Sequence, residues 1–329
     1  MKLAALFLIA CASVPVPARS NGDVQPQEVL VVVGAAGEPE FQEGFSSAAS
    51  KIEAACARYG VTCAVIGPGP ESDDRRTDRD LVVDWLKRVG RPSTVPAWVI
   101  YVGHGTWDGA HARLNLRGPD LAAQEILSSL AGQRRPFVMV HGGSASGPFI
   151  SVLSGANRVL VAATENGDEV NYARFGERFA DAVTSSEADI DRDGSTSLLE
   201  AALYAGQQVR TFYDEAGRMA TEHALIDDNG DSRGTPLEWF RGTRVVRKDE
   251  GGASPDGTLA RRFALIESSF ERGLTQQQRE RRAVLENQLE ALRERKSSMD
   301  ETDYLRELER VLRELAPIYV DPSAADQDT

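Results

Sequence analysis

Two histidines and a serine follow directly after apolar runs of the sequence. Trp98–Val102 is followed by His104 between two glycines, and Phe137–Val140 is followed by His141, two glycines and Ser144. Apolar runs of this kind predict buried strands of a parallel sheet, and the carboxyl ends of such strands meet on one edge. An imidazole transfers protons near neutral pH, and a hydroxyl attacks a carbonyl carbon when a base lies within hydrogen-bond reach. The sequence therefore predicts one site at this edge with the residue types of acyl-transfer chemistry.

The acidic segment 189–200 has the spacing of a calcium-binding loop. Its pattern is D-x-D-x-D-G with a glutamate at position twelve, and the residues after position nine have a helical pattern. Ca²⁺ prefers six or seven oxygen ligands, and the glycine at position six permits the sharp turn between them. We expect a structural Ca²⁺ held by Asp189, Asp191, Asp193, Ser197 and Glu200 and by the backbone carbonyl of Ser195. The alternative is an acidic helix cap that holds no metal.

A second acidic segment, 227–238, matches the same pattern less well. Oxygen-bearing side chains stand at positions one, three, five and twelve, namely Asp227, Asn229, Asp231 and Glu238. Position six is a serine instead of a glycine, and Pro236 delays the exit helix. The segment is therefore either a second, weaker calcium site or a turn rich in Asp and Asn.

The composition excludes several classes of partner. The 329 residues include 37 Lys and Arg against 50 Asp and Glu, so the net charge is −13. A chain this acidic offers no basic stripe to displace counterions from nucleic acid, and it does not suit an anionic membrane surface. Only four His and three Cys are present. Metal sites built from nitrogen and sulfur ligands are therefore nearly excluded.

The elements that position these residues follow from the hydrophobic pattern. Between residues 29 and 163, apolar runs alternate with amphipathic segments, which predicts a mostly parallel sheet covered by helices on both faces. The expected strands are 29–33, 61–66, 98–102, 137–140 and 158–163, and the expected helices are 41–59, 81–89 and 119–130. No dinucleotide-binding glycine pattern, Walker loop or HExxH motif occurs in the sequence.

The first twenty residues predict an export signal. A basic start precedes a short apolar run, and two prolines follow. Ala18-Arg19-Ser20 fits a cleavage site that would free a chain starting at Asn21, whereas Leu8–Cys11 resembles a bacterial lipobox in which Cys11 would be lipidated. Both routes predict an exported bacterial protein, either periplasmic or secreted or held at the outer membrane as a lipoprotein. No later segment is long and apolar enough to predict a transmembrane helix in the mature chain.

Export gives meaning to the two remaining cysteines. Cys56 is expected near the end of a helix and Cys63 in the strand that follows it. In an oxidising compartment a disulfide across this short turn is one interpretation, and a pair of buried thiols is the other.

The C-terminal third predicts a separate helical unit. Residues 247–258 form a linker rich in Gly, Asp, Ser and Pro, and residues 259–316 have the charged helical pattern of a coiled-coil-like hairpin. One apolar stripe contains Leu285, Leu289 and Leu292, and the other contains Leu305, Leu308, Leu312 and Leu315. We expect the stripes to pack on each other and on the main domain, and residues 317–329 to be a disordered tail.

Three of these segments resemble the legumain–caspase superfamily of cysteine peptidases (clan CD). Tyr101–Gly105 is similar to its His-Gly motif, Gly143–Gly147 to its nucleophile motif, and Ala163–Tyr172 to the segment that shapes the pocket for the substrate side chain. The resemblance implies a caspase-like three-layer α/β sandwich over residues 27–246, with both acidic loops inside it and the hairpin outside it.

The resemblance also implies a catalytic pair, but Ser144 stands where the family has its cysteine. His104 would occupy the position of the family's histidine, and Gly105, Trp107, Gly143 and Glu169 would line the substrate cleft. A thiol ionises near pH 8.5, whereas a serine hydroxyl needs an adjacent base. We therefore expect a catalytically inactive homologue that binds a peptide or protein segment. The alternatives are an active hydrolase using Ser144 with His104 or His141, and a calcium-stabilised structural protein that acts through its hairpin.

Overall fold

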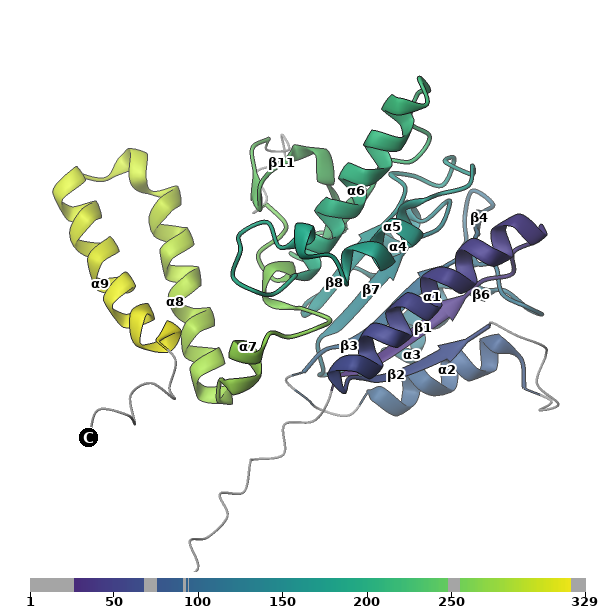
Figure 1. The fold of residues 1–329 in the computed structure, drawn as a ribbon, viewed down its shortest axis with the longest axis horizontal. Coiled ribbons are helices and arrows are strands. Elements are labelled where there is room, and N and C mark those ends of the chain that lie inside the picture. The colour runs from purple at the N-terminus through teal and green to yellow at the C-terminus, as the bar shows by residue number, and fades with distance from the viewer. Residues whose placement is uncertain (1–26, 68–75, 91–92, 94, 248–254, 321–329) are drawn as a thin grey trace, which may run out of the picture.

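The computed structural model describes residues 27–67, 76–90, 93, 95–247 and 255–320. A seven-stranded sheet lies at the centre with helices on both faces, and two long C-terminal helices project to one side (Figure 1). The strand order is β10-β9-β8-β7-β3-β1-β2. The predicted fold class, a three-layer α/β sandwich with a mostly parallel sheet and a C-terminal helical hairpin, is confirmed.

The five expected strands are all parallel neighbours in this sheet. They are β1 (Glu28–Val33), β2 (Thr62–Ile66), β3 (Ala97–Val102), β7 (Phe137–His141) and β8 (Arg158–Ala162). In β1, Val29 and Val31 pack on one face of the sheet and Leu30 and Val32 on the other. Both faces of this strand are buried, which explains why its run is apolar throughout.

Two short strands extend the sheet beyond β8. β9 (Leu225–Asp227) runs antiparallel to β8, and β10 (Thr235–Pro236) pairs with β9. Their lengths of three and two residues are too short for a periodic pattern, so the sequence did not predict them.

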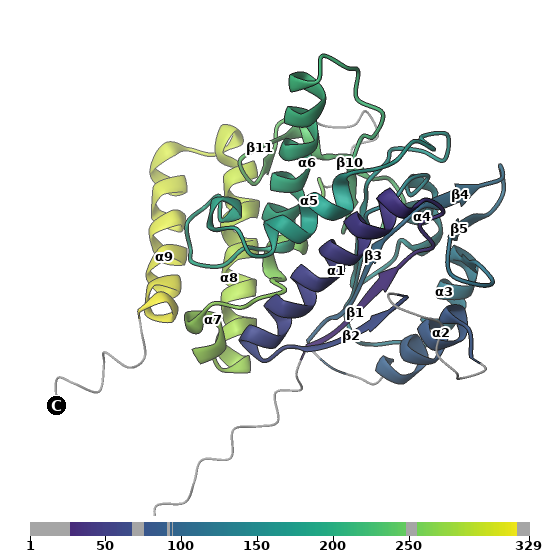
Figure 2. The same cartoon turned by 45° about the vertical axis from the view of Figure 1, so that its right-hand side comes forward.

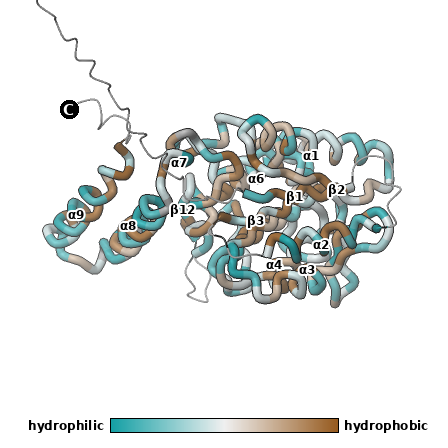
Figure 3. The backbone as a smooth tube through the Cα atoms, turned by 90° about the horizontal axis from the view of Figure 1, so that it is seen from below, coloured by the Kyte–Doolittle hydropathy of each residue, from teal (hydrophilic) through white to brown (hydrophobic). Residues whose placement is uncertain are grey.

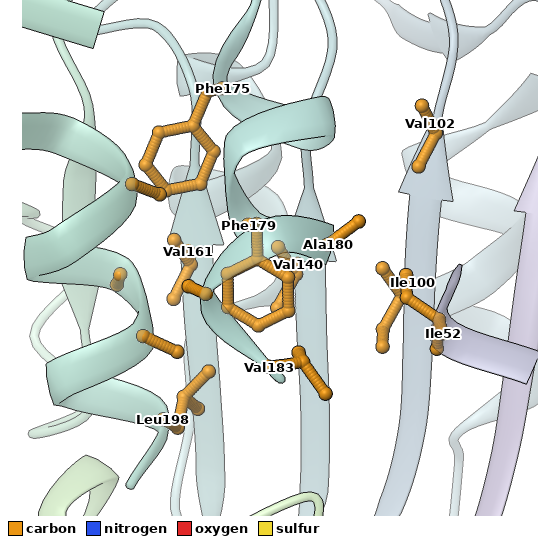
Figure 4. Packing of buried hydrophobic residues seen from close by; sticks show 14 of the residues in the cluster. Ile52, Ile100, Val102, Val140, Val161, Phe175, Phe179, Ala180, Val183 and Leu198 are labelled. Atoms are coloured by element: carbon orange, nitrogen blue, oxygen red, sulfur yellow. The ribbon is translucent and has the colours of Figure 1, made fainter. Parts of the chain in front are cut away.

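Helices from distant parts of the chain cover each face of the sheet. One face is covered by α1 (Pro39–Tyr59), α5 (Phe175–Ala182) and α6 (Leu198–Glu215). The other is covered by α2 (Asp78–Val89), α3 (Ala123–Ser129) and α4 (Gly147–Leu153). Figure 4 shows Phe179 of α5 packing beside Val140 and Val161 of the sheet.

An antiparallel insertion follows β3. It contains β4 (Gly105–Trp107), β5 (Ala112–Leu114) and β6 (Leu121–Ala122). The helix expected over residues 119–130 is therefore wrong in its first part, because Leu121 and Ala122 pair with β5 and the helix begins only at Ala123.

Cys56 and Cys63 are free thiols in the structure. Cys56 is buried at the end of α1, and Cys63 is partly buried in β2. A hydrogen bond between the two thiols lowers the pKa of Cys56 and, together with burial, raises that of Cys63. The two thiols are not bonded to each other in the structure, and both the disulfide and the buried-thiol interpretation stay predictions.

The C-terminal unit is a helical hairpin with its own small core. After the short helices η3 (Ala260–Arg262) and α7 (Ser269–Gly273), α8 (Gln276–Glu294) and α9 (Glu301–Tyr319) pack side by side, with the turn η4 (Lys296–Ser298) between them (Figure 2). The hairpin core contains Leu274, Leu285, Val311, Leu315 and Ile318. In Figure 3 the two helices project from the main body and show both hydrophilic and hydrophobic segments.

The hairpin differs from the sequence prediction in two respects. The second buried stripe is Tyr304, Val311, Leu315 and Ile318, whereas Leu305 and Leu312 are exposed. Helix α9 also continues to Tyr319, so residues 317–319 are helical and not part of a disordered tail.

Three further predictions concern segments that lie wholly or partly outside the described residues. They are the signal segment 1–20 with Cys11, most of the linker 247–258 and the tail beyond residue 320. Of the linker, residues 247 and 255–258 are described, and among them Asp256 and Gly257 are buried. Within the described part of the chain, no helix is both long enough and apolar enough to span a membrane.

Candidate functional site

Three loops at the carboxyl ends of β3, β7 and β8 form the site, which we call the Ser144 rim. It comprises residues 103–107, 142–146 and 164–169. The first two loops meet closely because glycines line their contact. A Cβ atom on Gly143 would overlap the Gly103 carbonyl, and one on Gly105 would overlap the Ser144 carbonyl. The prediction that His104 and Ser144 follow neighbouring strands is confirmed, since β3 pairs with β7.

The Ser144 side chain is buried and bonded to the opposite loop. Only 2% of the residue is exposed, its Oγ accepts a hydrogen bond from the Gly105 N–H at 3.2 Å, and its hydroxyl faces the Gly105 carbonyl at 3.3 Å. The next residue, Ala145, has a left-handed φ of 51° and donates its N–H to the Glu169 carbonyl at 2.9 Å. Ser144 thus joins two loops of the rim, and the third is bonded to its neighbour.

His104 is partly buried in an aromatic environment. Its ring makes edge contacts with Phe41, Phe45 and Tyr172. Burial lowers the pKa of His104, and a hydrogen bond to the Ala36 carbonyl opposes that shift. Among the described residues, no ion pair or hydrogen bond joins His104 to a carboxylate or to Ser144. A histidine in this setting is neutral at pH 7 and lacks the orienting acid of a catalytic triad.

His141 lies beneath the rim. Its Nδ1 accepts the Gly143 N–H at 3.2 Å, and its ring contacts Tyr101 and Phe149. Burial lowers the pKa of His141 to about 3. Its Nε2 has no hydrogen-bond partner in the described part of the chain. His141 therefore supports the backbone of the nucleophile loop, and its low pKa makes it a weak base.

The remaining rim residues include one cluster that the sequence did not predict. Trp107 packs against Gly167, where a Cβ atom would overlap the indole.

Glu169 forms a close ion pair with His223, and Glu165 lies near them. Glu165, Glu169 and His223 each offer a ligand atom, and these atoms lie within 4.8 Å of one another. His223 comes from the segment before β9, more than fifty residues later in the chain, and no local pattern links it to Glu169.

The first acidic loop gathers three carboxylates. Oxygens of Asp189, Asp191 and Asp193 lie within 4.8 Å of one another. Burial, with smaller contributions from Asp191, Glu200 and Asp189, raises the pKa of Asp193 to about 6. All the donors in this loop are oxygens, which fits Ca²⁺ better than a softer metal.

Glu200 holds the first loop closed from the start of α6. Its two oxygens accept hydrogen bonds from the N–H groups of Ile190, Asp191 and Ser197 and from the Ser197 hydroxyl. Ser195 also contacts a distant segment, because its Oγ accepts the Ser268 N–H at 3.1 Å. Binding of a cation by Glu200, Ser195 and Ser197 stays a prediction.

The second acidic loop differs from the sequence assignment at position twelve. The Glu238 side chain is 55% exposed, and its ion-pair contact among the described residues is with Arg247, at 3.9 Å. The buried Asp256 lies against the loop instead.

A cavity of about 630 Å³ lies between the first acidic loop and the hairpin. Its lining includes Asp191 and Asp193 on one side and Arg282, Leu312 and Tyr319 on the other, and it includes neither His104 nor Ser144. It is therefore separate from the Ser144 rim.

Searches with family models and against curated proteins give no match. Solved structures with a similar chain course include the initiator caspase Dronc of Drosophila, with 14% identity and a TM-score of 0.41, over 64% of this chain and 82% of that one. Another is caspase-1 from Spodoptera frugiperda, with 11% identity and a TM-score of 0.40 over 67% and 95%. A third is a secreted C11 cysteine protease from Bacteroides thetaiotaomicron, solved with an irreversible peptide inhibitor, with 12% identity and a TM-score of 0.40 over 62% and 66%. The fold assignment rests on the sheet order and layers described above.

Proposed function

We propose that this chain is a legumain/caspase-like protein that binds a peptide or protein segment at the Ser144 rim without cleaving it. The observation that carries the proposal is the environment of Ser144. Its hydroxyl is buried, and its hydrogen bonds go to the backbone of Gly105. A nucleophile needs an exposed oxygen and a base that accepts its proton. Here the hydroxyl proton faces a carbonyl oxygen, which does not act as a base.

The surroundings of Ser144 support the same conclusion. The Gly105 N–H is a backbone donor beside the serine oxygen, and it already donates to that oxygen. It is thus not free to stabilise a developing oxyanion. The pKa values of His104 and His141 are both lowered by burial, so neither histidine is a strong base.

A binding surface persists at the rim without catalysis. Trp107 is partly exposed, Val170 is 64% exposed, and Glu165 and Asp168 carry negative charge beside them. This mixture of apolar and acidic groups suits a peptide with apolar and basic side chains.

We further propose that Ca²⁺ bound in the first acidic loop stabilises the domain, and that the chain is exported. The three clustered carboxylates support the calcium site, and the N-terminal sequence supports export. Mass spectrometry of the mature N-terminus distinguishes an acylated Cys11 from a free Asn21.

Affinity selection from a peptide library on the immobilised full chain tests the binding proposal. The expected result is that wild type and Ser144→Ala enrich the same peptides, because the buried hydroxyl does not face the ligand. Trp107→Ala is expected to lose them. Trp239→Ala, at a half-buried tryptophan of the short helix η2 (Leu237–Trp239) that follows β10, is the matched control and is expected to retain them. Enrichment that is absent in the wild type, or unchanged in Trp107→Ala, would contradict binding at the rim.

A further inference from the structure

The two acidic loops share an unusual backbone conformation although their sequences differ. At position four, Arg192 has a φ of 60° in the first loop and Gly230 a φ of 79° in the second. At position six, Gly194 has a φ of 87° and Ser232 a φ of 66°. A serine rarely adopts the left-handed region, so the second loop follows the course of the first in spite of its side chain.

In the first loop a single carboxylate fastens three positions. Glu200 Oε1 accepts the N–H groups of Ile190 and Asp191 at 2.9 and 3.0 Å, which are positions two and three. Glu200 Oε2 accepts the hydroxyl of Ser197, position nine, at 2.7 Å.

In the second loop Asp256 makes the corresponding contacts. Its Oδ1 accepts the N–H groups of Asp228 and Asn229 at 2.8 and 3.1 Å, again positions two and three. Its Oδ2 accepts the hydroxyl of Thr235, position nine, at 2.6 Å. A residue eighteen places beyond Glu238 therefore takes the part that the sequence pattern gave to Glu238.

An independent observation points to a missing ligand in the second loop. Asp227 is only 1% exposed, and its Oδ2 has no hydrogen-bond partner among the described residues. In the first loop both oxygens of Asp189 accept N–H groups, one of them from position six. In the second loop the N–H at position six, on Ser232, donates instead to Ser154 Oγ at 3.0 Å. The Ser154 hydroxyl lies beside the Asp227 carboxylate, yet no donor among the described residues has hydrogen-bond geometry to this buried oxygen, and a cation in the loop would complete its contacts.

The chemistry of the surrounding groups selects the cation. The side chains at positions one, three and five are Asp227, Asn229 and Asp231, and position seven offers the carbonyl of Arg233. Carboxylate, amide and carbonyl oxygens are the ligands of a hard cation, and Ca²⁺ accepts the irregular geometry of such a loop.

We propose that residues 227–235 and Asp256 form a second calcium site. The ligands would be Asp227, Asn229, Asp231 and the Arg233 carbonyl. Asp256 would take the position-twelve role that the sequence pattern gives to Glu238. The ion would join the end of β9 to the segment that leads to the hairpin. There Asp228 already accepts the N–H groups of Gly257, Leu259 and Ala260. This inference goes beyond the proposed function and does not depend on whether the rim binds peptides.

Isothermal titration of the calcium-free full chain with CaCl₂, checked by native mass spectrometry, tests the proposal. Wild type is expected to bind two ions. Asp256→Asn, which keeps one acceptor oxygen, is expected to lose one ion or to bind it about 10- to 100-fold more weakly. Glu238→Gln is the matched control and is expected to bind two ions with unchanged affinity. Asp189→Asn is expected to affect the other ion only.

Other results would overturn the inference. These are an unchanged number and affinity of bound ions in Asp256→Asn, loss of an ion in Glu238→Gln, or a wild type that binds no ion. A wild type that binds one ion overturns the inference when Asp256→Asn still binds that ion, and supports it when Asp256→Asn has lost it. Circular dichroism without calcium checks that each variant is folded. If Asp256→Asn is not folded, Asp231→Asn replaces it, because Asp231 is exposed, and it is likewise expected to lose or weaken one ion.

Discussion

At the scale of single residues, Ser144 serves the protein as a link between two loops. Its hydroxyl oxygen accepts the Gly105 N–H, and the hydroxyl also faces the Gly105 carbonyl. Buried backbone groups need such partners, so this serine has a structural role independent of any reaction.

Ser144→Ala is therefore expected to destabilise the folded state. Removing the hydroxyl leaves the buried Gly105 N–H without its acceptor, which costs about 1–3 kcal/mol. Denaturant unfolding of the full chain measures this difference in the free energy of unfolding. Ser151→Ala, at an exposed serine of α4, is the control and should change stability by about 0.5 kcal/mol or less. Equal stability of wild type and Ser144→Ala would show that the hydroxyl does not hold the rim together.

His141 predicts a loss of stability in acid. Its pKa is about 3 in the folded state and about 6.5 when unfolded, so only the unfolded chain takes up a proton as the pH falls below 6.5. The stability contributed by this group is complete above pH 6.5 and is lost progressively towards pH 3. At pH 5 the loss amounts to about 2 kcal/mol.

Unfolding measurements at pH 7 and pH 5 check this prediction. Between these values wild type should lose about 2 kcal/mol more than His141→Gln, which cannot be protonated there. His111→Gln, at an exposed histidine, controls for the loss of a histidine elsewhere. Equal losses for wild type and His141→Gln would show that His141 titrates normally in the folded protein.

The positions of residues directly after predicted strands could be inferred from the sequence. Contacts between residues far apart in the sequence could not. His104 and Ser144 were assigned to one rim because parallel strands end on one edge. Two contacts depend on the path of the chain through α5, α6 and the segment after the linker. One joins Glu169 to His223, and the other joins Asp256 to the second acidic loop. No spacing rule encodes that path.

At the scale of elements, long apolar runs were predictable and short strands were not. Four of the five parallel strands, β1, β3, β7 and β8, are buried on both faces, and burial imposes a continuous apolar run, whereas the edge strand β2 is half-buried. β6 was mistaken for the start of a helix because its two residues carry no period of their own. The stripe on α9 was assigned to leucines, but the face that meets α8 contains Val311, Leu315 and Ile318.

This reassignment of α9 predicts that substitutions at two leucines of the same helix reduce the stability of the hairpin by different amounts. Leu315 is 5% exposed and Leu312 is 46% exposed, so Leu315→Ala opens a cavity in the hairpin whereas Leu312→Ala does not. We expect Leu315→Ala to cost about 2–5 kcal/mol of hairpin stability and Leu312→Ala less than about 1 kcal/mol. Hydrogen exchange of the α8 and α9 amides measures both. A larger effect at Leu312 would mean that the stripe predicted from sequence packs on another part of the molecule.

At the scale of the whole molecule, the sheet and the hairpin have separate cores. Two clusters cover the faces of the sheet, and a third, smaller one lies within the hairpin. The segment between them is anchored to the body at several points, including Leu198 N–H to the Phe263 carbonyl and Gln27 to the Ala264 carbonyl.

Deleting residues 269–329 should therefore leave the α/β domain folded. Because the deleted part shares no core cluster with the sheet, the thermal midpoint of the domain should shift by about 5 °C or less. The full chain should show an additional, less stable transition from the hairpin, and scanning calorimetry of both proteins resolves the two. A truncated chain that does not fold would show that the hairpin completes the main core.

We propose peptide-library hydrolysis as the direct test of whether the Ser144 rim binds peptides without cleaving them. Three proteins are compared in the presence of calcium: wild type, Ser144→Ala and Ser144→Cys. If the rim binds peptides without cleaving them, wild type and Ser144→Ala release no products. Cleavage by Ser144→Cys alone would add that the rim retains a peptidase frame from which only the nucleophile is missing. Cleavage by wild type that is abolished in Ser144→Ala would contradict the account and make this protein a serine-dependent peptidase.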